Sequence, residues 1–516
     1  MDGYRTRILN DYLSVQSTLY YGGSQVTEQN PLPCSIGGDS VTITGDITIP
    51  GDVKVSNGSN GPLLVNVVQS TQLPLATGSN TIGAVSIVYG SLAVSGSNPL
   101  PTTAVYPDEY VDAFGRQRVS ECFTLGDYKH IYGIDPNFID RLTNGGAVGF
   151  VRNKACCTLT TTTAANSAVL HQTRCYHHYQ PGKSHYIMSS VNFGGFQSNV
   201  VKRTGYYDDN DGIYLELNGS NELSFNIRTF SSGAAVNTRA VQASWNRDRL
   251  DGTGPSGVTL DMTKTQLFFT DFQWLGVGRV RCGFSLDGVS VVAHEFYHSN
   301  RRETVYIANP SLPIRCELSN VGAVASPGGA MDQICSTVIS EGGYMETGID
   351  YSALTGIRTI SAGLGNALPL MCIALTNTFN TYPNRVLVRL VNSSVFSADN
   401  NLSYQILRIP SISSVVGGAW SNVDANSAVQ YNATATSLSS LGTAMSVSFV
   451  AGGATGPPGQ GTFIGSSATN FGSSAKRNYI AQNIDSTDSE VYAIYVKTLT
   501  ANATNVIGGM QWREVY

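Results

Sequence analysis

Arg279-Val-Arg-Cys-Gly-Phe-Ser-Leu-Asp-Gly-Val-Ser-Val-Val-Ala-His294 predicts a β-hairpin. Apolar residues alternate with polar or small ones in the first half of this stretch, valines dominate the second half, and Asp287-Gly288 between them is a dipeptide typical of a tight hairpin turn. Many similar stretches follow one another from Asp112 to the C-terminus, separated by turn signals such as Asn218-Gly219. That spacing is typical of antiparallel β-sandwiches of the jelly-roll or lectin type. The sequence therefore predicts an all-β protein.

The end of this hairpin contains a motif that resembles a zinc site. His294-Glu-Phe-Tyr-His298 matches the HExxH pattern of zinc proteases, in which two histidines one helical turn apart bind the metal. The preceding residues favour a strand, in which the two imidazoles would lie about 13 Å apart at about 3.3 Å per residue. One zinc ion cannot be bound by both across that distance. Glu317, the candidate third ligand, also lies in a predicted strand, so we expect no zinc at this motif.

Composition limits the class of protein. Charged residues make up 13% of the chain, about half of the roughly 25% usual for soluble domains. Hydrophobic residues at 41% are sufficient to build folded cores. The formal net charge of −5 argues against a nucleic-acid partner, which normally requires a basic surface. No apolar run reaches the roughly 20 residues of a membrane-spanning helix, so the sequence predicts no membrane partner either.

The 516 residues are expected to form four parts. Residues 1–28 are polar and mixed, and we interpret them as an N-terminal anchoring segment with one short helix around residues 5–19. Residues 29–110 contain short alternating strands between recurring Asn-Pro-Leu-Pro-type sequences, which indicates a repetitive β-stem. A flexible linker is the alternative, but linkers lack such alternation. Residues 111–315 and 316–516 are predicted to form two β-sandwich domains. The change between them falls near residues 310–350, where Asn309-Pro-Ser-Leu-Pro and Glu341-Gly-Gly are the candidate connections.

The cysteines bear on the compartment in which the chain folds. All nine are irregularly spaced, their number is odd, and no CxxC pair is present. The first residues lack the apolar core of a secretory signal. We therefore expect folding in a cytoplasm, with most cysteines as reduced thiols packed in β-cores.

Two further groups of residues offer metal-ligand side chains. Tyr207-Asp-Asp-Asn-Asp-Gly212 places three carboxylates in one turn, but its spacing is one residue short of the EF-hand calcium loop. A plain hairpin turn between two strands is the favoured interpretation. Cys175-Tyr-His177-His178 has no matching cluster elsewhere, which favours ordinary strand residues.

The sequence contains carboxylates that could cleave a glycan, but their spacing does not identify a catalytic pair. A glycosidase needs two carboxyl groups about 5–10 Å apart across a groove. Asp208, Asp271, Asp287 and Glu295 are candidates, but the sequence selects no pair among them. It also contains no GxSxG nucleophile elbow and no Walker-type phosphate loop. We therefore expect a protein that is not an enzyme, with no catalytic, cofactor-binding or metal-binding residues and no cofactor.

Several stretches between residues 112 and 345 together resemble a group of viral proteins. They are Asp112-Ala-Phe-Gly-Arg-Gln-Arg-Val-Ser120, Tyr179-Gln-Pro-Gly-Lys-Ser184, Leu260-Asp-Met-Thr-Lys-Thr-Gln266, Asp271-Phe-Gln-Trp-Leu-Gly-Val-Gly-Arg-Val-Arg281, Asn309-Pro-Ser-Leu-Pro-Ile-Arg315 and Ile334-Cys-Ser-Thr-Val-Ile-Ser-Glu-Gly-Gly343. In these stretches the chain resembles a family of virion-associated structural proteins, fibre-, spike- or decoration-like, of tailed bacteriophages and some large DNA viruses. The Asn-Pro-Leu-Pro repeats also resemble those in the stems of phage fibres. The resemblance carries over no catalytic residue.

The resemblance implies a virion component exposed on the capsid or tail, assembled in the host cytoplasm, with host attachment as a further role. The expected partners are further copies of the chain in a homotrimer, and capsid, portal-neck or tail proteins through the N-terminal segment. Host surface glycans are a third kind of partner. Two alternative functions stay open: a carbohydrate-binding receptor-recognition protein, and a glycan-degrading tailspike. In the former, loop aromatics such as Tyr206, Tyr207 or Trp420 would stack on sugar rings, although core packing is favoured for any one of them.

Overall fold

The computed structural model describes residues 20–21, 24–25, 88–89, 92–93, 111–113, 121–398, 400–452, 465–470 and 479–516. The chain divides into two units, Met1–Ala104 and Val105–Tyr516. In the first unit, two short hairpins are described: β1 (Tyr20–Tyr21) with β2 (Ser24–Gln25), and β3 (Val88–Tyr89) with β4 (Leu92–Ala93). The helix predicted around residues 5–19 and most of the predicted stem lie outside the described residues.

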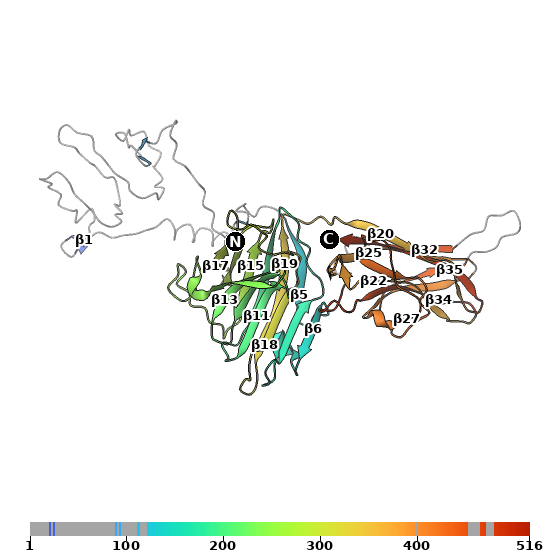
Figure 1. Ribbon diagram of the computed structural model, residues 1–516, viewed down its shortest axis with the longest axis horizontal. Coiled ribbons are helices and arrows are strands. Elements are labelled where there is room, and N and C mark those ends of the chain that lie inside the picture. The colour runs from blue at the N-terminus through green and yellow to red at the C-terminus, as the bar shows by residue number, and fades with distance from the viewer. Residues whose placement is uncertain are drawn as a thin grey trace. The chain divides into compact units, whose positions relative to one another are not determined.

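The second unit begins with a β-sandwich of two antiparallel sheets, drawn in cyan to yellow in Figure 1. Its strands are β5 (Cys122–Lys129), β6 (Phe138–Thr143), β7 (Ala147–Val151), β8 (Cys156–Thr160), β9 (Ala168–Thr173), β10 (Ser184–Asn192), β11 (Val200–Tyr207), β12 (Gly212–Leu217), β13 (Leu223–Thr229), β14 (Val236–Val241), β15 (Gln266–Phe272), β16 (Val280–Leu286), β17 (Val289–Phe296), β18 (Ile314–Asn320) and β19 (Ala330–Glu341). One sheet has the order β17-β16-β15-β10-β19-β8-β7, with β5 also paired to β19. The other has the order β14-β13-β12-β11-β18-β9-β6.

The hairpin at residues 279–294 is present as predicted. β16 and β17 pair antiparallel, and Leu286 lies opposite Val289 across the two-residue turn. Asp287 has φ 50° and Gly288 has φ 85°, the left-handed values that an Asp-Gly hairpin turn requires.

The interior of this sandwich is rich in aromatic rings. Phe225 stacks on Trp245 with ring centroids 4.4 Å apart, and Phe268 and Phe284 lie against the same group. All four rings are buried. Burial of one large apolar side chain stabilises a fold by about 1.5–3 kcal/mol, so this group makes a major contribution to the packing of the two sheets.

A second sandwich follows, drawn in orange to red in Figure 1. Its strands are β20 (Ile349–Leu354), β21 (Arg358–Ile360), β22 (Ala367–Leu375), β25 (Leu387–Ser397), β26 (Leu402–Ile409), β28 (Ser421–Asn422), β29 (Val429–Asn432), β31 (Thr443–Val450), β32 (Gly465–Asn470), β33 (Tyr479–Ile480), β34 (Val491–Thr498) and β35 (Thr504–Val515). One sheet has the order β20-β35-β25-β32, with β21 paired to β35 and β33 paired to β25. The other has the order β28-β29-β22-β34-β26-β31.

The remaining described elements are short. They are the strand pairs β23 (Thr378–Phe379) with β24 (Tyr382–Pro383) and β27 (Val415–Val416) with β30 (Ser437–Leu438), and the 3-10 turns η2 (Arg152–Lys154), η3 (Gln242–Ser244) and η4 (Ile412–Ser414). The prediction of an all-β fold with two sandwiches is confirmed. None of the helical turns in the described part of the chain has the length and apolarity needed to span a membrane.

The boundary between the sandwiches lies later than the predicted position between residues 315 and 316. That position falls inside β18, which pairs with β9 and β11 of the first sandwich. β19 pairs with β10 in the same sandwich and runs to Glu341, and the second sandwich starts with β20 at Ile349. The Pro-rich segment at residues 309–313 is therefore a loop inside the first sandwich. Distant strands pair in an antiparallel sandwich, so a strong turn signal does not mark the end of a domain.

Candidate functional site

A cavity of about 1030 Å³ lies where the two sandwiches of the second unit meet. Its lining combines acidic and aromatic side chains, including Asp208, Asp209, Asp211, Phe230, Trp274, Tyr382 and Asp485. The first five come from loops of the first sandwich, and the last two from the second. The acidic turn of residues 208–211 is the centre of the site.

This turn closes the hairpin of β11 and β12, as the sequence predicts. Asp208 Oδ1 accepts hydrogen bonds from the backbone N–H of Asn210 at 2.8 Å and of Asp211 at 2.9 Å. An aspartate that binds the backbone ahead of it is typical of a tight turn. Gly212 follows at φ 135°, where a Cβ would lie 2.2 Å from the Cβ of Tyr207, so only glycine fits there. The turn therefore has one fixed shape.

Asp211 attaches the turn to two neighbouring segments. Its Oδ1 accepts the backbone N–H of Ala308 at 2.7 Å and that of Phe230 at 3.1 Å, and the residue is 3% exposed. Burial raises the pKa of this carboxyl to about 6, although the two backbone donors act in the opposite direction. Asp211 thus holds Phe230 at the cavity wall, and both of its hydrogen bonds serve the fold.

Asp209 is an ionised carboxylate held by two arginines. Arg315 Nη1 donates to it at 2.5 Å and Arg141 Nη1 at 3.3 Å. Burial alone would raise the pKa of Asp209, but the two guanidinium groups outweigh it and the pKa is lowered. Arg315 is 1% exposed, and its guanidinium lies over the ring of Tyr207, 5.3 Å from the centroid. The charge of Asp209 is therefore fixed in place and largely balanced.

Contacts between the sandwiches frame the cavity. Arg141 Nη1 also donates to Asp485 Oδ1 at 2.7 Å, which joins β6 to a loop of the second sandwich. Arg385 stacks over the ring of Tyr176 at 4.7 Å and donates to the backbone oxygen of Ile484 at 2.6 Å. Arg141 and Arg385 therefore stabilise the packing of the residues that line the cavity.

Two aromatic residues give the cavity its apolar surface. Trp274 Nε1 donates to the backbone oxygen of Ile307 at 2.8 Å, which fixes the half-buried indole ring. Tyr382, in β24, is 66% exposed. The site therefore places aromatic rings beside carboxylates in one open cavity.

Comparison with known proteins finds no family model and no curated protein that matches the chain. The solved structures that are similar to parts of it include the following three. A protein of unknown function from Shewanella oneidensis MR-1 shares 10% identity over 46% of this chain and 94% of its own, with a TM-score of 0.29. The CBM2 module of the evolved Dit of Lactobacillus casei BL23 phage J-1 shares 8% over 44% and 99%, with a TM-score of 0.29. The carbohydrate recognition domain of Emp47p shares 12% over 41% and 93%, with a TM-score of 0.25. Similarities this distant are no basis for assigning a function.

The HExxH residues lie in separate environments. β17 contains His294 and ends at Phe296, so the prediction of a strand rather than a helix is confirmed. His294 Nδ1 accepts the backbone N–H of Asn246 at 3.3 Å, whereas His298 lies beyond the strand and its Nδ1–H donates to the backbone oxygen of Gly278 at 2.7 Å. The candidate third ligand, Glu317, forms an ion pair with Arg203 at 2.8 Å.

The other candidate carboxylates do not line the cavity with Asp208. Asp271 is buried in an ion pair with Arg281. Glu295 pairs with Arg279 at 3.4 Å, and Asp287 occupies the β16–β17 turn.

The remaining candidate residues have structural roles. Tyr206 and Tyr207 are 0% exposed, so neither is presented on a loop. Tyr206 faces the core between the sheets, whereas Tyr207, on the opposite face of β11, packs against Arg315 and Tyr214. Trp420 packs against a buried cluster of the second sandwich. His177 donates from Nδ1 to the backbone oxygen of Leu312 at 3.0 Å and bonds Tyr128 through Nε2 at 2.8 Å. Trp274 and Tyr382 were missed, since a single aromatic residue after a strand is no motif by itself.

Three buried side chains that could hold a metal lie elsewhere in the first sandwich. His130, Cys157 and His171 each place one ligand atom within 4.8 Å of the other two. They come from three separate places in the sequence and form no local pattern, which is why the sequence did not indicate them.

Proposed function

We propose that this protein is a structural component of a virus particle that binds a host surface glycan in the cavity at the 208–211 turn. The combination of carboxylates and aromatic rings in that cavity supports the glycan-binding role. The resemblance of residues 112–345 to virion-associated proteins supports the particle role.

The chemistry of the lining suits a sugar. Hydroxyl groups donate to carboxylates, and the C–H face of a pyranose packs on an aromatic ring, which offers a flat apolar surface. Trp274 and Tyr382 supply rings, and Asp208 supplies a carboxylate whose Oδ1 is used within the turn, leaving Oδ2 for a ligand hydroxyl. A volume of about 1030 Å³ accommodates more than one sugar ring.

Binding without cleavage is favoured over hydrolysis. A glycosidase needs one protonated carboxyl group and one ionised carboxylate free to act on the substrate. Asp211 has the raised pKa of such an acid, but it is buried and accepts two backbone N–H groups. Asp209 is ionised, but two arginines hold it. A glycan-degrading tailspike remains the competing function, and its activity is an outcome of the test.

Glycan binding is tested with the purified full chain, its host's envelope glycans and calorimetry. Replacing the exposed Tyr382 with alanine should weaken binding about three- to tenfold, the effect of losing one aromatic contact. Asp208→Asn should also weaken it, because an asparagine oxygen preserves the turn while the charge is lost. Tyr132→Ala is the matched control, since Tyr132 is 99% exposed on the first sandwich and outside the cavity lining.

Equal affinity in all four proteins would reject the cavity as the glycan site. Release of new reducing ends from the glycan by the wild-type chain would favour the tailspike function instead. The particle role is tested by the position and copy number of the chain in an electron-microscopy map of the intact virion, and absence from purified particles would reject it.

We further propose that three copies assemble along residues 29–110. Apolar residues such as Val65 and Val67 alternate with polar neighbours there, so each predicted strand has one face that requires a partner. The number three rests on the resemblance to viral fibre stems. Glutamate at Val65 and Val67 should dissociate the assembly in light scattering, whereas glutamate at Asn66, on the opposite face, should not. A monomeric mass for the wild-type chain would refute the trimer.

A further inference from the structure

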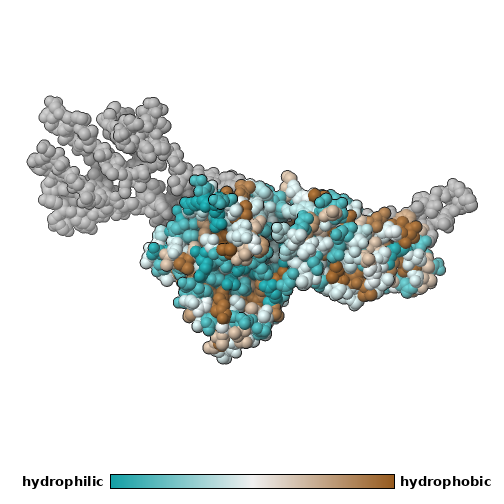
Figure 2. Space-filling model, viewed as in Figure 1, coloured by the Kyte–Doolittle hydropathy of each residue, from teal (hydrophilic) through white to brown (hydrophobic). Residues whose placement is uncertain are grey.

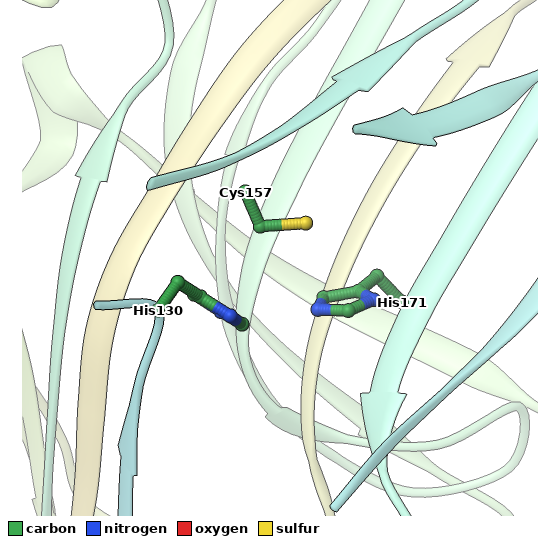
Figure 3. A group of neighbouring side chains, drawn as sticks. All are labelled: His130, Cys157 and His171. Atoms are coloured by element: carbon green, nitrogen blue, oxygen red, sulfur yellow. The ribbon is translucent and has the colours of Figure 1, made fainter. Parts of the chain in front are cut away.

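The interior of the first sandwich contains two histidines and a cysteine that face one another. His130 directly follows β5, Cys157 lies in β8 and His171 in β9, and Figure 3 shows the three side chains pointing toward a common centre. All three are 0% exposed. Their ligand atoms lie within 4.8 Å of one another. No site described above uses any of them.

The two imidazole rings leave nitrogen atoms unsatisfied. Nε2 of His130 and Nε2 of His171 are both buried and neither makes a well-formed hydrogen bond in the described part of the chain, although the side chain of Gln333 interacts with His130. Buried polar atoms are nearly always paired, and an unpaired group usually marks a missing ligand, ion or water. Two such nitrogens beside one thiol indicate a metal ion, which would accept an electron pair from each nitrogen and from the sulfur.

A carboxylate orients His171 as it would orient a metal ligand. Asp140, the residue opposite His171 across the β6–β9 pair, contacts Nδ1 through Oδ1 at 2.5 Å. The carboxylate accepts, so Nδ1 carries the proton and the lone pair of Nε2 points to the centre of the group. The ring also stacks on Phe138 with centroids 4.3 Å apart. This carboxylate–histidine arrangement is typical of zinc sites.

We propose that His130, Cys157 and His171 form a buried zinc site inside the first sandwich. Zinc favours imidazole nitrogen and thiolate sulfur in tetrahedral geometry. With zinc bonds of about 2.0–2.3 Å, ligand atoms lie about 3.3–3.8 Å apart, so any pair of ligand atoms that is farther apart than this must move closer on binding. Gln333 is the Cα partner of Cys157, and its Oε1 is buried without a hydrogen-bond partner in the described residues. It is suited to the fourth position.

One hydrogen bond must be given up when zinc binds. The backbone N–H of Asp135 donates to His130 Nδ1 at 3.0 Å, which places the His130 proton on Nε2 in the metal-free protein. Coordination through Nε2 moves that proton to Nδ1, so Asp135 has to move away. Asp135 lies in the loop between β5 and β6, where such a shift leaves the sheets intact. A single neutral hydrogen bond is weak beside the bonds of a structural zinc ion.

The position of the site gives the metal a structural role. Cys157 and His130 belong to the eight-stranded sheet, and His171 belongs to the seven-stranded sheet. A shared zinc ion would therefore join the two sheets across the core. The described cysteines are all free thiols, so within these residues no disulfide supplies such a link.

Metal titration of the full chain tests the site. The chain is stripped with a chelator and returned to buffer with reductant. Separate samples are then titrated with Zn²⁺ and with Co²⁺. We expect one equivalent to bind, with a thiolate-to-cobalt absorption band, and a rise in the unfolding temperature. Cys157→Ser should remove the band and the thermal shift. Cys282→Ser, a buried free thiol on β16, several strands away from β8, is the matched control and should retain both.

A second variant tests whether Asp140 orients His171 without binding the metal itself. Asp140→Asn leaves all three ligands in place but weakens the orientation of His171, and should lower zinc affinity about 10- to 100-fold while the cobalt band persists. If Cys157→Ser fails to fold, alkylation of wild-type chain with and without zinc replaces it, and Cys157 should be the thiol that zinc protects. Absence of bound metal in the wild type would overturn the site, as would binding unchanged in Cys157→Ser. Metal lost only with His294→Ala would overturn it in favour of the HExxH motif.

Discussion

The two sandwiches share an architecture of paired antiparallel sheets but differ in what they bury. All seven histidines of the chain, from His130 to His298, lie in the first sandwich. Its interior also contains the Asp271–Arg281 ion pair and a group of stacked aromatic rings. The interior of the second sandwich is mainly Leu, Ile and Val. On the face shown in Figure 2, hydrophilic residues are prominent over the first sandwich, and more apolar patches lie over the second.

The second sandwich nevertheless buries carboxylates in hydrogen-bond networks, and the network of Glu514 joins its two sheets. Glu514 accepts from Ser427 Oγ at 2.6 Å, from the backbone N–H of Ala428 at 2.7 Å and from Trp512 Nε1 at 2.9 Å, and Tyr516 donates to it at 2.8 Å. This network fastens the last strand, β35, to the opposite sheet. The comparison shows that the same architecture can either have an interior that is mainly aliphatic or contain buried histidines throughout. The second arrangement is where the candidate metal site lies.

The largest expected difference between the two sandwiches is their response to acid. Burial lowers the pKa of His177 to about 4, of His185 to about 3 and of His298 to about 4, from an ordinary value of 6.5. Unfolding exposes these rings, so the unfolded chain binds more protons between pH 6.5 and 4. Their contribution is therefore complete above pH 6.5 and is lost as the pH falls toward 4. For His177 alone this amounts to about 3 kcal/mol.

Hydrogen exchange read by mass spectrometry at a series of pH values measures this difference. Peptides from the first sandwich should lose protection between pH 6.5 and 4 before those from the second sandwich. Simultaneous loss in both would contradict the assignment of acid sensitivity to the histidines. His177→Gln, which cannot take up a proton, should move the loss of protection to lower pH.

A smaller effect is expected from the Glu514 network. Glu514→Gln keeps the shape of the side chain but presents an amide N–H₂ to groups that donate, and should destabilise the second sandwich by about 1–3 kcal/mol. Unfolding in urea followed by hydrogen exchange of peptides from each sandwich measures it. The first sandwich should unfold as in the wild type, and so should Glu303→Gln, a change at an exposed site. A loss of stability shared by both sandwiches would show that they unfold as one.

The smallest effect is expected at the contact between the sandwiches. The Arg141 side chain is 37% exposed and bridges Asp209 and Asp485. Exposed ion pairs contribute little, so Arg141→Ala should change the free energy of unfolding by less than about 1 kcal/mol. It should nevertheless weaken glycan binding, because it removes the link between Asp209 and Asp485 at the cavity edge. Calorimetry of the variant with the glycan that the wild type binds checks this, and unchanged affinity would show that the bridge does not shape the cavity.

Local patterns predicted the elements but not their partners. The alternation and the Asp-Gly turn at residues 279–294 identified β16 and β17, and turn chemistry identified the hairpin at residues 208–211. The domain boundary lies later than residue 315 because β18 and β19 pair with strands far earlier in the chain, and Thr337 on β19 bonds Gly126 across 211 residues. Periodicity shows that a strand has a buried face, but it does not show which strand lies beside it.

The same limit applies to the candidate sites. The acidic residues of the cavity were visible as a cluster in the sequence, whereas Tyr382 reaches it from the other sandwich. His130, Cys157 and His171 come together only through sheet pairing and the packing of one sheet on the other. Tyr206 and Tyr207 were candidates for exposed aromatics next to a polar turn, yet their strand lies in the middle of its sheet.

The position of β19 has a consequence for synthesis on the ribosome. β19 lies between β10 and β8 in its sheet and also pairs with β5, yet it is the last strand of the first sandwich to be made. At about 5–20 residues per second, roughly 10–40 s pass between the emergence of Cys122 and that of Glu341. During this interval β5, β8 and β10 have no central strand to join, and their open edges are available to other nascent chains. A chain stopped before Ala330 should therefore aggregate or remain bound to chaperones, and release of folded, protease-resistant protein should require residues up to Glu341.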